Sequence, residues 1–255
     1  MPPLVEPVPL RRGVRAWFTG RALDDARPQV GQAGNLSARR PHEPARLAAD
    51  RQAAYGAMGL DAREVHTMRQ VHGTDVTVVT DDVPAGAQAP DVDALVSSQP
   101  GRALAVMVAD CVPLLVAAPG AVAAAHAGRL GALAGIVDRT LDVLDDVATG
   151  AERTAAIGPS IRGCCYEVPA AMQADAARRA PAAATTTTWG TPSIDLPTLV
   201  AADLARRGVD VVDGGVCTAC DERWFSHRRD PESGRQVGVI VLEDGGDREG
   251  DEVAA

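Results

Sequence analysis

The stretch LAVMVADCVPLLVAAPGAVAAAHAG, residues 104–128, is the longest apolar run of the chain. Pro119 and Gly120 divide it into two arms, as expected of a turn. Each arm is short and rich in Val, Leu and Ala, which fits a buried strand better than a helix. Polar residues, Pro and Gly interrupt the run too often for a membrane span. It therefore predicts two buried strands that pair as a hairpin.

Asp110, Cys111 and His126 are the only polar or reactive side chains in this run. In a hairpin about the Pro-Gly turn, His126 faces Pro113 and Cys111 faces Gly128, so the thiol and the imidazole share one face. Such diagonal neighbours lie roughly 7–8 Å apart, and a slip of one residue would separate them. Each residue alone is more often part of a core. Together they predict a metal site that needs a third ligand, since a catalytic zinc usually has three protein ligands.

His72 is the preferred third ligand. It lies beside a glycine between two strand-like segments, 64–70 and 76–80, where a side chain can project from a strand junction. A junction histidine is otherwise most often a loop residue. His42 lacks a comparable setting, and His66 stays open as an alternative.

Composition limits the classes of function. The 255 residues are 46% hydrophobic, which suits one large domain or two small ones. The net charge of -9 argues against a nucleic-acid partner. All 25 basic residues are arginine, which excludes Schiff-base chemistry and a Walker A loop. The N-terminus has no signal-peptide pattern and no long apolar span follows, so we expect a cytoplasmic protein without membrane association.

Strands and helices alternate along the rest of the chain. Residues 1–13 should be extended and residues 243–255, acidic and Gly-rich, disordered. The apolar stripe of residues 129–148 predicts one helix, whose N-terminus near the metal would favour an anion. Residues 170–186 predict a helix and a mobile link. Further strands are expected at 14–19, 91–96, the start of 155–168, 209–212 and 237–242, and further helices at 43–59 and 196–208.

Cys217 and Cys220 have zinc-knuckle or redox spacing. A single such pair lacks a partner pair for a structural metal site, unless Cys164 and Cys165 come near. The five cysteines are an odd number, unlike a disulfide framework.

A series of motifs resembles one family. The chain is similar, over about residues 14–242, to the YfiH-like laccase-domain proteins, which are also called multicopper polyphenol oxidases and purine nucleoside phosphorylases. The family's His-Cys-His set falls on His72, Cys111 and His126. Residues 18–21, 35–37 and 128–131 depart from the family pattern, which affects substrate contacts rather than the triad. The motifs are MRQVHGTDV (68–76), VDALVSS (92–98), VADCVPLLV (108–116), AAHAG (124–128), IGPSIRGCCYEV (157–168), SIDLP (193–197), FSHRR (225–229) and SGRQ (233–236).

The resemblance implies a single α+β domain over residues 14–242, with a mixed, largely antiparallel sheet core flanked by helices, akin to the catalytic domain of a cytotoxic necrotising factor. It also implies zinc, and purine nucleosides and inorganic phosphate as partners. The expected reactions are phosphorolysis of adenosine, inosine and methylthioadenosine, and deamination of adenosine.

Zinc fits the composition better than copper. A multicopper oxidase needs clustered His-x-His pairs, and the five histidines of this chain form none. Cys with two His could hold one copper. The cytidine-deaminase signature is also absent. We expect Asp110 or His227 as the general acid or base. Arginines bind phosphate in a bidentate manner, and the predicted substrate or phosphate contacts are Arg21, Arg69, Gln70 and Arg129.

Three other classes of function stay open, one of which is oxidation of phenols by a copper-dependent enzyme. The resemblance extends to proteins that edit peptidoglycan precursors by hydrolysis, in which Cys111 would be the nucleophile and His126 its base. A binding module with a closed, structural metal site is the third possibility. Metal analysis separates these, because an ion on Cys111 leaves no free thiolate.

Overall fold

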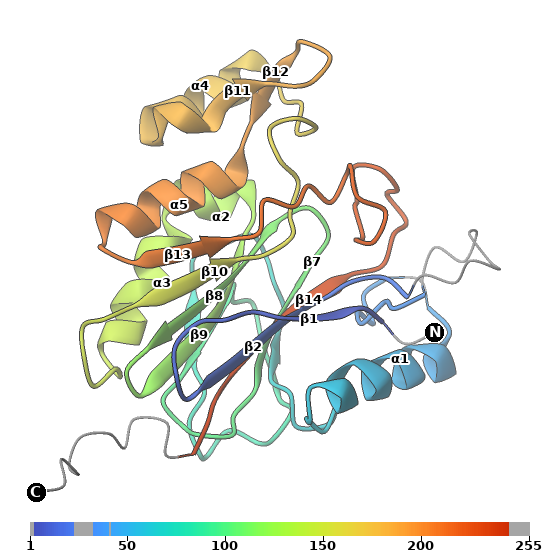
Figure 1. The fold of residues 1–255 in the computed structure, drawn as a ribbon, viewed down its shortest axis with the longest axis vertical. Coiled ribbons are helices and arrows are strands. Elements are labelled where there is room, and N and C mark those ends of the chain that lie inside the picture. Colours follow the sequence, from blue (N-terminus) through green and yellow to red (C-terminus); the bar gives the residue numbers. More distant parts are fainter. Residues whose placement is uncertain (1–2, 23–32, 41, 245–255) are drawn as a thin grey trace, which may run out of the picture.

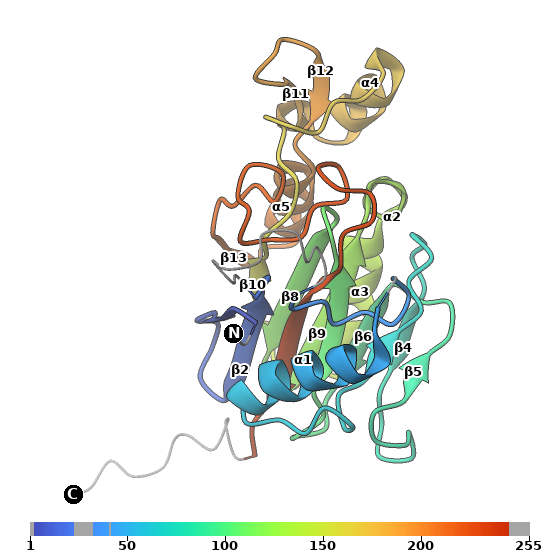
Figure 2. The ribbon, with the colours of Figure 1, turned by 90° about the vertical axis from the view of Figure 1, so that its right-hand side faces the viewer.

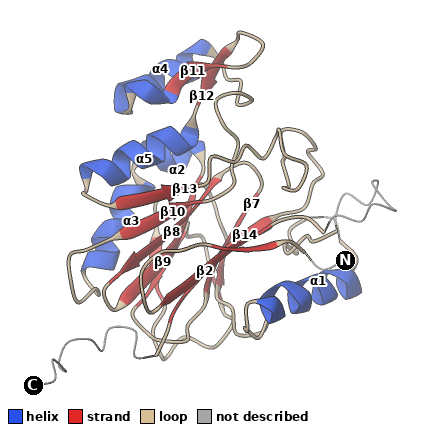
Figure 3. Ribbon diagram, in the orientation of Figure 1, coloured by secondary structure: helices blue, strands red, loops and turns tan. Residues whose placement is uncertain are grey.

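Two β-sheets packed face to face form the centre of the protein in the computed structural model, which describes residues 3–22, 33–40 and 42–244 (Figures 1 and 3). The first sheet is antiparallel, in the order β1 (Val5–Pro7), β2 (Val14–Thr19), β14 (Gln236–Leu242) and β7 (Leu104–Val108). The second has the order β13 (Asp210–Asp213), β10 (Thr154–Ile157), β8 (Val112–Ala118), β9 (Ala121–Ala127), β6 (Ala94–Ser97) and β4 (Val76–Val78).

Only the two outer pairs of the six-stranded sheet are parallel, β13 with β10 and β4 with β6. The fold is therefore α+β with mixed, largely antiparallel sheets, as expected. Two short ribbons complete the strands: β3 (Thr67–Met68) pairs with β5 (Gln88–Ala89), and β11 (Ala184–Thr186) pairs with β12 (Pro192–Ile194).

Helices cover the outer faces of the two sheets (Figure 2). On the six-stranded sheet lie α2 (Arg129–Ala134), α3 (Ile136–Asp145) and α5 (Leu196–Arg206). On the four-stranded sheet lies α1 (Pro44–Ala57), whose Tyr55 packs against alternate residues of β7 and β14. The helix α4 (Ala170–Arg179) packs on the β11–β12 ribbon, and the 3-10 turn Pro181–Ala183 packs against α4 and α5.

Alternate side chains of β8 belong to the two apolar layers. Leu114 and Val116 pack toward the helices, whereas Leu115 and Ala117 pack toward the first sheet. A strand presents successive side chains to opposite faces, so a strand that is apolar on both faces must lie between two layers. The continuous apolar run of the sequence is explained by this central position.

The predicted hairpin is present with the predicted register. In the β8–β9 pair, Pro113 lies opposite His126, and the turn residue Gly120 has a φ of 68°. The first arm, however, is not one strand. Residues 104–108 pair with β14 in the other sheet, and the chain changes sheets at Asp110, whose φ is 85°.

Two other expectations need correction. Residues 129–148 form two helices, because Gly135 has a φ of 97° and ends α2 in the left-handed region. Leu130 of the predicted apolar stripe is 55% exposed. The expected mobile link before residue 186 is instead a 3-10 turn followed by a paired strand.

The N-terminal segment is extended in part, since β1 pairs with β2. The expected tail falls mostly outside the described residues. Among the described residues, no helix is long and apolar enough to cross a membrane.

Candidate metal centre

His72, Cys111 and His126 come together at the end of the hairpin. Their ligand atoms all lie within 4.8 Å of one another. Cys111 Sγ is 3.8 Å from His72 Nε2, and the two imidazole rings meet edge to face at 4.7 Å between centroids. His126 is buried, Cys111 is half-buried and His72 is exposed. The thiol and two imidazoles predicted from the sequence are therefore brought to one point.

Asp93 fixes two of these three residues. Its fully buried carboxylate accepts a hydrogen bond from His126 Nδ1 at 2.7 Å. It also accepts from the backbone N–H groups of His72, at 3.0 Å, and Gly73, at 2.7 Å. The first contact orients the ring so that Nε2 of His126 is the nitrogen available to an ion. The others hold the backbone of His72, whose φ of 63° is uncommon for a residue other than glycine.

Gly128 leaves the room that the three ligand side chains need. A Cβ added there would lie 2.6 Å from His72 Cδ2, 3.3 Å from Cys111 Sγ and 3.3 Å from His126 Cε1. Any larger residue would therefore press on all three ligands at once. Gly128 also immediately precedes the first turn of α2.

Cys111 and His126 shift each other's pKa in opposite directions. Burial alone would raise the pKa of the Cys111 thiol, but the adjacent His126 and His72 imidazoles lower this pKa to about 6. Burial would likewise lower the pKa of His126, but the Cys111 thiolate and the Asp93 carboxylate raise it to about 9. Near neutral pH the pair is a thiolate and an imidazolium.

The group fits a divalent metal ion. One thiolate and two neutral imidazoles are ordinary zinc ligands, the ligand atoms are close enough to share an ion, and a buried carboxylate supports one histidine as metal sites commonly require. Three protein ligands leave a fourth coordination position for a reactant. The same set could hold one copper, but this centre gathers no further histidine among the described residues for a copper cluster.

A cavity of about 410 Å³ opens on the triad. Its lining is rich in cations. Beyond the three ligands, the polar and charged side chains that line it are Ser37, Arg39, Arg40, Arg51, Gln70, Gln88, His227 and Arg235. This size suits a small molecule such as a nucleoside, and the arginines suit an anionic group.

Arg40 and Arg235 are two arginines of this lining whose charges act on each other. Burial lowers the pKa of Arg235, and the charge of Arg40 lowers it further. Both guanidinium groups donate hydrogen bonds to nearby backbone carbonyls. Arg235 donates to Ser233 and Gly234, each at 2.9 Å, and Arg40 donates to Pro231. Two like charges held close together favour an anion beside them, and the Glu232 carboxylate, 3.7 Å from Arg40, supplies part of this negative charge.

His227 also lines the cavity, as its predicted role requires. Its Nδ1 lies 3.1 Å from the carbonyl oxygen of Pro231, which can only accept a hydrogen bond. Nδ1 therefore carries a proton in this contact, and Nε2 is the nitrogen that can exchange a proton with a ligand.

Asp110 adjoins Cys111 but turns away from the cavity. Its two carboxylate oxygens accept from Thr218 Oγ1 and from the backbone N–H of Arg228, each at 2.6 Å. Its backbone carbonyl accepts from Ile161 N–H at 2.9 Å. These contacts hold the corner between β7 and β8, and a part of Asp110 in proton transfer stays a prediction.

Of the predicted substrate contacts, only Gln70 lines the cavity. Its side-chain amide donates a hydrogen bond to the C=O of Met107 and accepts one from the N–H of Met107. Arg21 lies over the ring of Phe225. Arg69 pairs with Asp91, and Arg129 lies beside Tyr166. These three arginines stay predictions that the cavity lining does not support.

Sequence reasoning missed Arg39, Arg40, Arg51 and Arg235. Arg235 stood inside the quoted SGRQ motif, which was the one available signal. The other three lie in or near α1, far along the chain from the hairpin, and only the packing of α1 on the first sheet brings them to the cavity.

Comparisons with known proteins identify the family of the chain. The family model described as multi-copper polyphenol oxidoreductase laccase matches residues 15–243. A Streptomyces coelicolor protein named purine nucleoside phosphorylase is 43% identical over 82% of this chain and 88% of its own. The Escherichia coli purine nucleoside phosphorylase YfiH is 35% identical over 82% and 86%.

Solved structures show the same fold. A Neisseria meningitidis protein superposes with a TM-score of 0.80 at 28% identity, covering 95% of this chain and all of its own. A Bacillus licheniformis protein, the hypothetical protein YfiH, gives 0.80 at 25% identity over 90% and 93%.

Proposed function

The chain belongs to the multi-copper polyphenol oxidoreductase laccase family, and we propose that it is a zinc-dependent purine nucleoside phosphorylase. Its substrates would be adenosine, inosine or methylthioadenosine with inorganic phosphate, and its products the free base and ribose 1-phosphate. Deamination of adenosine would be a second activity of the same site. One observation carries the proposal: the His72–Cys111–His126 triad lies at a cavity lined by arginines.

The arginines of the cavity bind phosphate. Arg40 and Arg235 lie close enough to repel each other, and a phosphate dianion would relieve that repulsion and accept hydrogen bonds from both. Bound in this way, a phosphate oxygen is directed at the anomeric carbon of the ribose. Holding the nucleophile and the nucleoside in one cavity removes much of the entropic cost of their encounter.

His227 is the candidate for proton delivery. As the C–O bond to phosphate forms, the glycosidic C–N bond breaks and its electron pair leaves with the purine. The purine then needs a proton, and His227 can supply it from Nε2, because Nδ1 is engaged with Pro231.

His72, Cys111 and His126 would hold the metal, which when bound supplies a Lewis acid beside the reacting purine. Asp93 and Gly128 keep these three ligands in place. The open side of the triad faces the cavity, so a substrate can reach it.

The test uses purified, zinc-loaded protein with inosine. Phosphate-dependent release of hypoxanthine with an equal amount of ribose 1-phosphate supports the proposal. Release of free ribose, or no release of base, contradicts it. Ammonia release from adenosine without phosphate reports the deaminase activity separately.

A peptidoglycan-precursor hydrolase is the second candidate, because one specific observation favours it. A Cys111 thiolate beside a His126 imidazolium is the arrangement of a cysteine nucleophile. Zinc decides between the two functions. A hydrolase of this kind is inhibited by stoichiometric zinc and active without it, whereas the phosphorylase requires the metal.

A further inference from the structure

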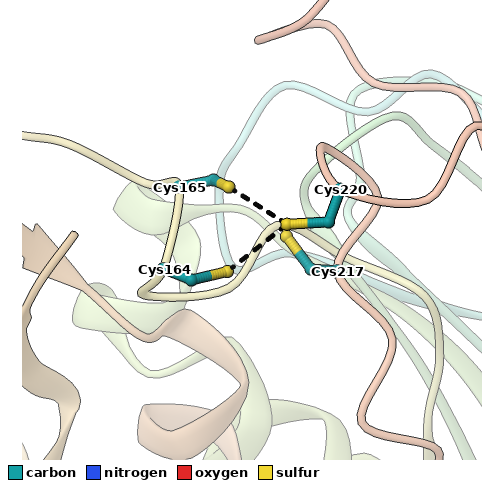
Figure 4. A group of neighbouring side chains, drawn as sticks. All are labelled: Cys164, Cys165, Cys217 and Cys220. Carbon is teal, nitrogen blue, oxygen red and sulfur yellow. Dashed lines mark hydrogen bonds between the residues drawn. The ribbon is translucent and has the colours of Figure 1, made fainter. Parts of the chain in front are cut away.

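Four cysteines, none of them part of the triad, converge on a second point (Figure 4). Cys164 and Cys165 lie on the turn that follows β10, and Cys217 and Cys220 on the segment between β13 and β14. All four sulfur atoms lie within 4.8 Å of one another. Cys220 Sγ is 3.7 Å from Cys164 Sγ and 3.3 Å from Cys165 Sγ, and all are free thiols.

These separations match a tetrahedral metal site. Zinc–sulfur bonds of about 2.3 Å at the tetrahedral angle place the sulfur atoms about 3.8 Å apart. A disulfide instead needs about 2.05 Å. The side chains reach this spacing from two segments some 50 residues apart in sequence, which the parallel bridge between Ser160 and Cys217 aligns.

The backbone around Cys217 favours a thiolate. Cys220 N–H and Asp221 N–H donate to the carbonyl of Cys217 and close the Cys-x-x-Cys turn. Arg162 N–H donates to Cys217 Sγ at 3.5 Å. Burial would raise the pKa of this thiol, but the N–H groups of Arg162, Cys220 and Ala219 lower it.

Burial, together with negative charge on Cys217, raises the pKa of the neighbouring thiols of Cys164 and Cys165. Burial raises the pKa of Cys164 to about 12, and the hydrogen bond and charge of Cys217 add to the effect. The pKa of Cys165 is raised by burial and by contacts with Cys220 and Cys164. The four sulfur atoms are therefore close enough to act as ligands of a single ion. A divalent cation bound at their centre would release the thiol protons to solvent.

We propose that Cys164, Cys165, Cys217 and Cys220 form a second metal site, a tetrathiolate that binds one structural Zn²⁺. Four protein ligands leave no open position, so this ion has no part in the chemistry. Its chemical environment also differs from that of the triad, which offers one sulfur and two nitrogens.

The location of the cluster indicates a structural role for the ion. Thr218 lies between Cys217 and Cys220 and donates to the carboxylate of Asp110, and its N–H donates to the carbonyl of Ser160. Ile161, from the other segment, donates to the carbonyl of Asp110. Both segments of the cluster therefore hold the residue next to Cys111. An ion that joins them would fix the corner on which the triad depends.

The cysteine count allows a clean experiment. The chain has five cysteines, so Cys111→Ala leaves only the four of the cluster. We expect this variant, expressed with zinc and purified under reducing conditions, to retain about one zinc per chain. The wild type should hold about two, and Cys217→Ser/Cys220→Ser should hold only the ion that Cys111 binds.

Cobalt substitution of Cys111→Ala identifies the ligands with all four cluster thiols intact. The expected result is the thiolate-to-cobalt charge-transfer band and the intense visible bands of a tetrahedral sulfur site. A Cys111→Ala variant that is folded by circular dichroism but holds no metal and gives no such bands would overturn the proposal. So would a mass lower by four hydrogens, which shows two disulfides. Neither readout depends on nucleoside turnover, so the result is independent of the proposed function.

Discussion

Asp93 and His126 are joined by a hydrogen bond of 2.7 Å that is buried from solvent. The same carboxylate holds the backbone of His72. One side chain, on the segment that leads into β6, therefore orients two of the three ligands of the metal centre. Its position also shows why the motif VDALVSS matters to the site, although it supplies no ligand itself.

Replacing Asp93 should weaken metal binding without unfolding the protein. In Asp93→Asn the side chain keeps its shape but loses the charge that orients His126 and raises its basicity. Supporting residues of this kind typically change metal affinity or activity by about 10–100-fold. Competition with a chromophoric chelator measures the zinc affinity. An unchanged affinity would show that Asp93 has no influence on the centre.

A methyl group at position 128 should block the centre sterically. Gly128→Ala places a Cβ at 2.6 Å from the His72 ring, which real structures do not tolerate. We expect loss of zinc at the triad and of turnover, with the metal of the cysteine cluster retained. Gly214→Ala is the matched control, since a Cβ there meets nothing within 4 Å. Equal zinc content in the two variants would contradict the geometry.

Metal binding at the triad should release protons, and its pH dependence should follow the shifted pKa values of Cys111 and His126. Below a pH of about 9, His126 holds a proton in the metal-free protein, and a metal ion must displace it. Below a pH of about 6, Cys111 holds one as well. Zinc affinity should therefore rise with pH up to about 9, and rise more steeply below about 6.

Calorimetry in two buffers of different ionisation enthalpy counts the released protons. The count should be at least one at pH 7.5 for the triad, measured on Cys217→Ser/Cys220→Ser so that the cluster does not contribute. Zinc binding that releases no proton at this pH would show that His126 is already neutral.

The arginines of the cavity should act on phosphate more than on nucleoside. Arg235→Met removes one of two adjacent charges, and a lost bidentate contact to a charged group costs about 1.5–3 kcal/mol, or roughly 10–150-fold in KM for phosphate. The KM for inosine should change little. Arg178→Met is the control, because Arg178 is an exposed residue of α4. Parallel changes in both KM values would argue against a phosphate site here.

His227 should affect turnover and not metal content. Loss of a positioned general acid typically lowers kcat by about 10²–10⁴-fold. His227→Ala should show such a loss with a full complement of zinc and an unchanged fold. A kcat close to that of the wild type would assign proton delivery to another group.

The sequence was sufficient to predict the β8–β9 hairpin and its register. The Pro119-Gly120 turn sets the pairing, and the apolar alternation that follows fixes which residues share a face. Once the register is known, Cys111 and His126 must lie together. His72 was preferred only from its place beside a glycine at a strand junction, and the family motif supported the choice, because its position depends on a loop held by Asp93 rather than on any periodic pattern.

Features that depend on tertiary packing could not be predicted in this way. The change of sheet at Asp110 has no local signal, since residues 104–108 and 112–118 are equally apolar. The cavity arginines Arg40 and Arg51 come from a different part of the chain. The approach of Cys164 and Cys165 to the other cysteines was raised as a condition, and only the alignment of two loops fulfils it.

The proposed function depends on a metal ion that the Cys111 thiol and the His72 and His126 imidazoles hold at the mouth of the cavity. Anomalous scattering from crystals of the zinc-loaded protein, recorded on both sides of the zinc absorption edge, tests it directly. We expect a peak about 2.3 Å from Cys111 Sγ and about 2.0–2.1 Å from Nε2 of His72 and His126. A protein that turns over inosine but shows no peak among these three atoms would contradict it.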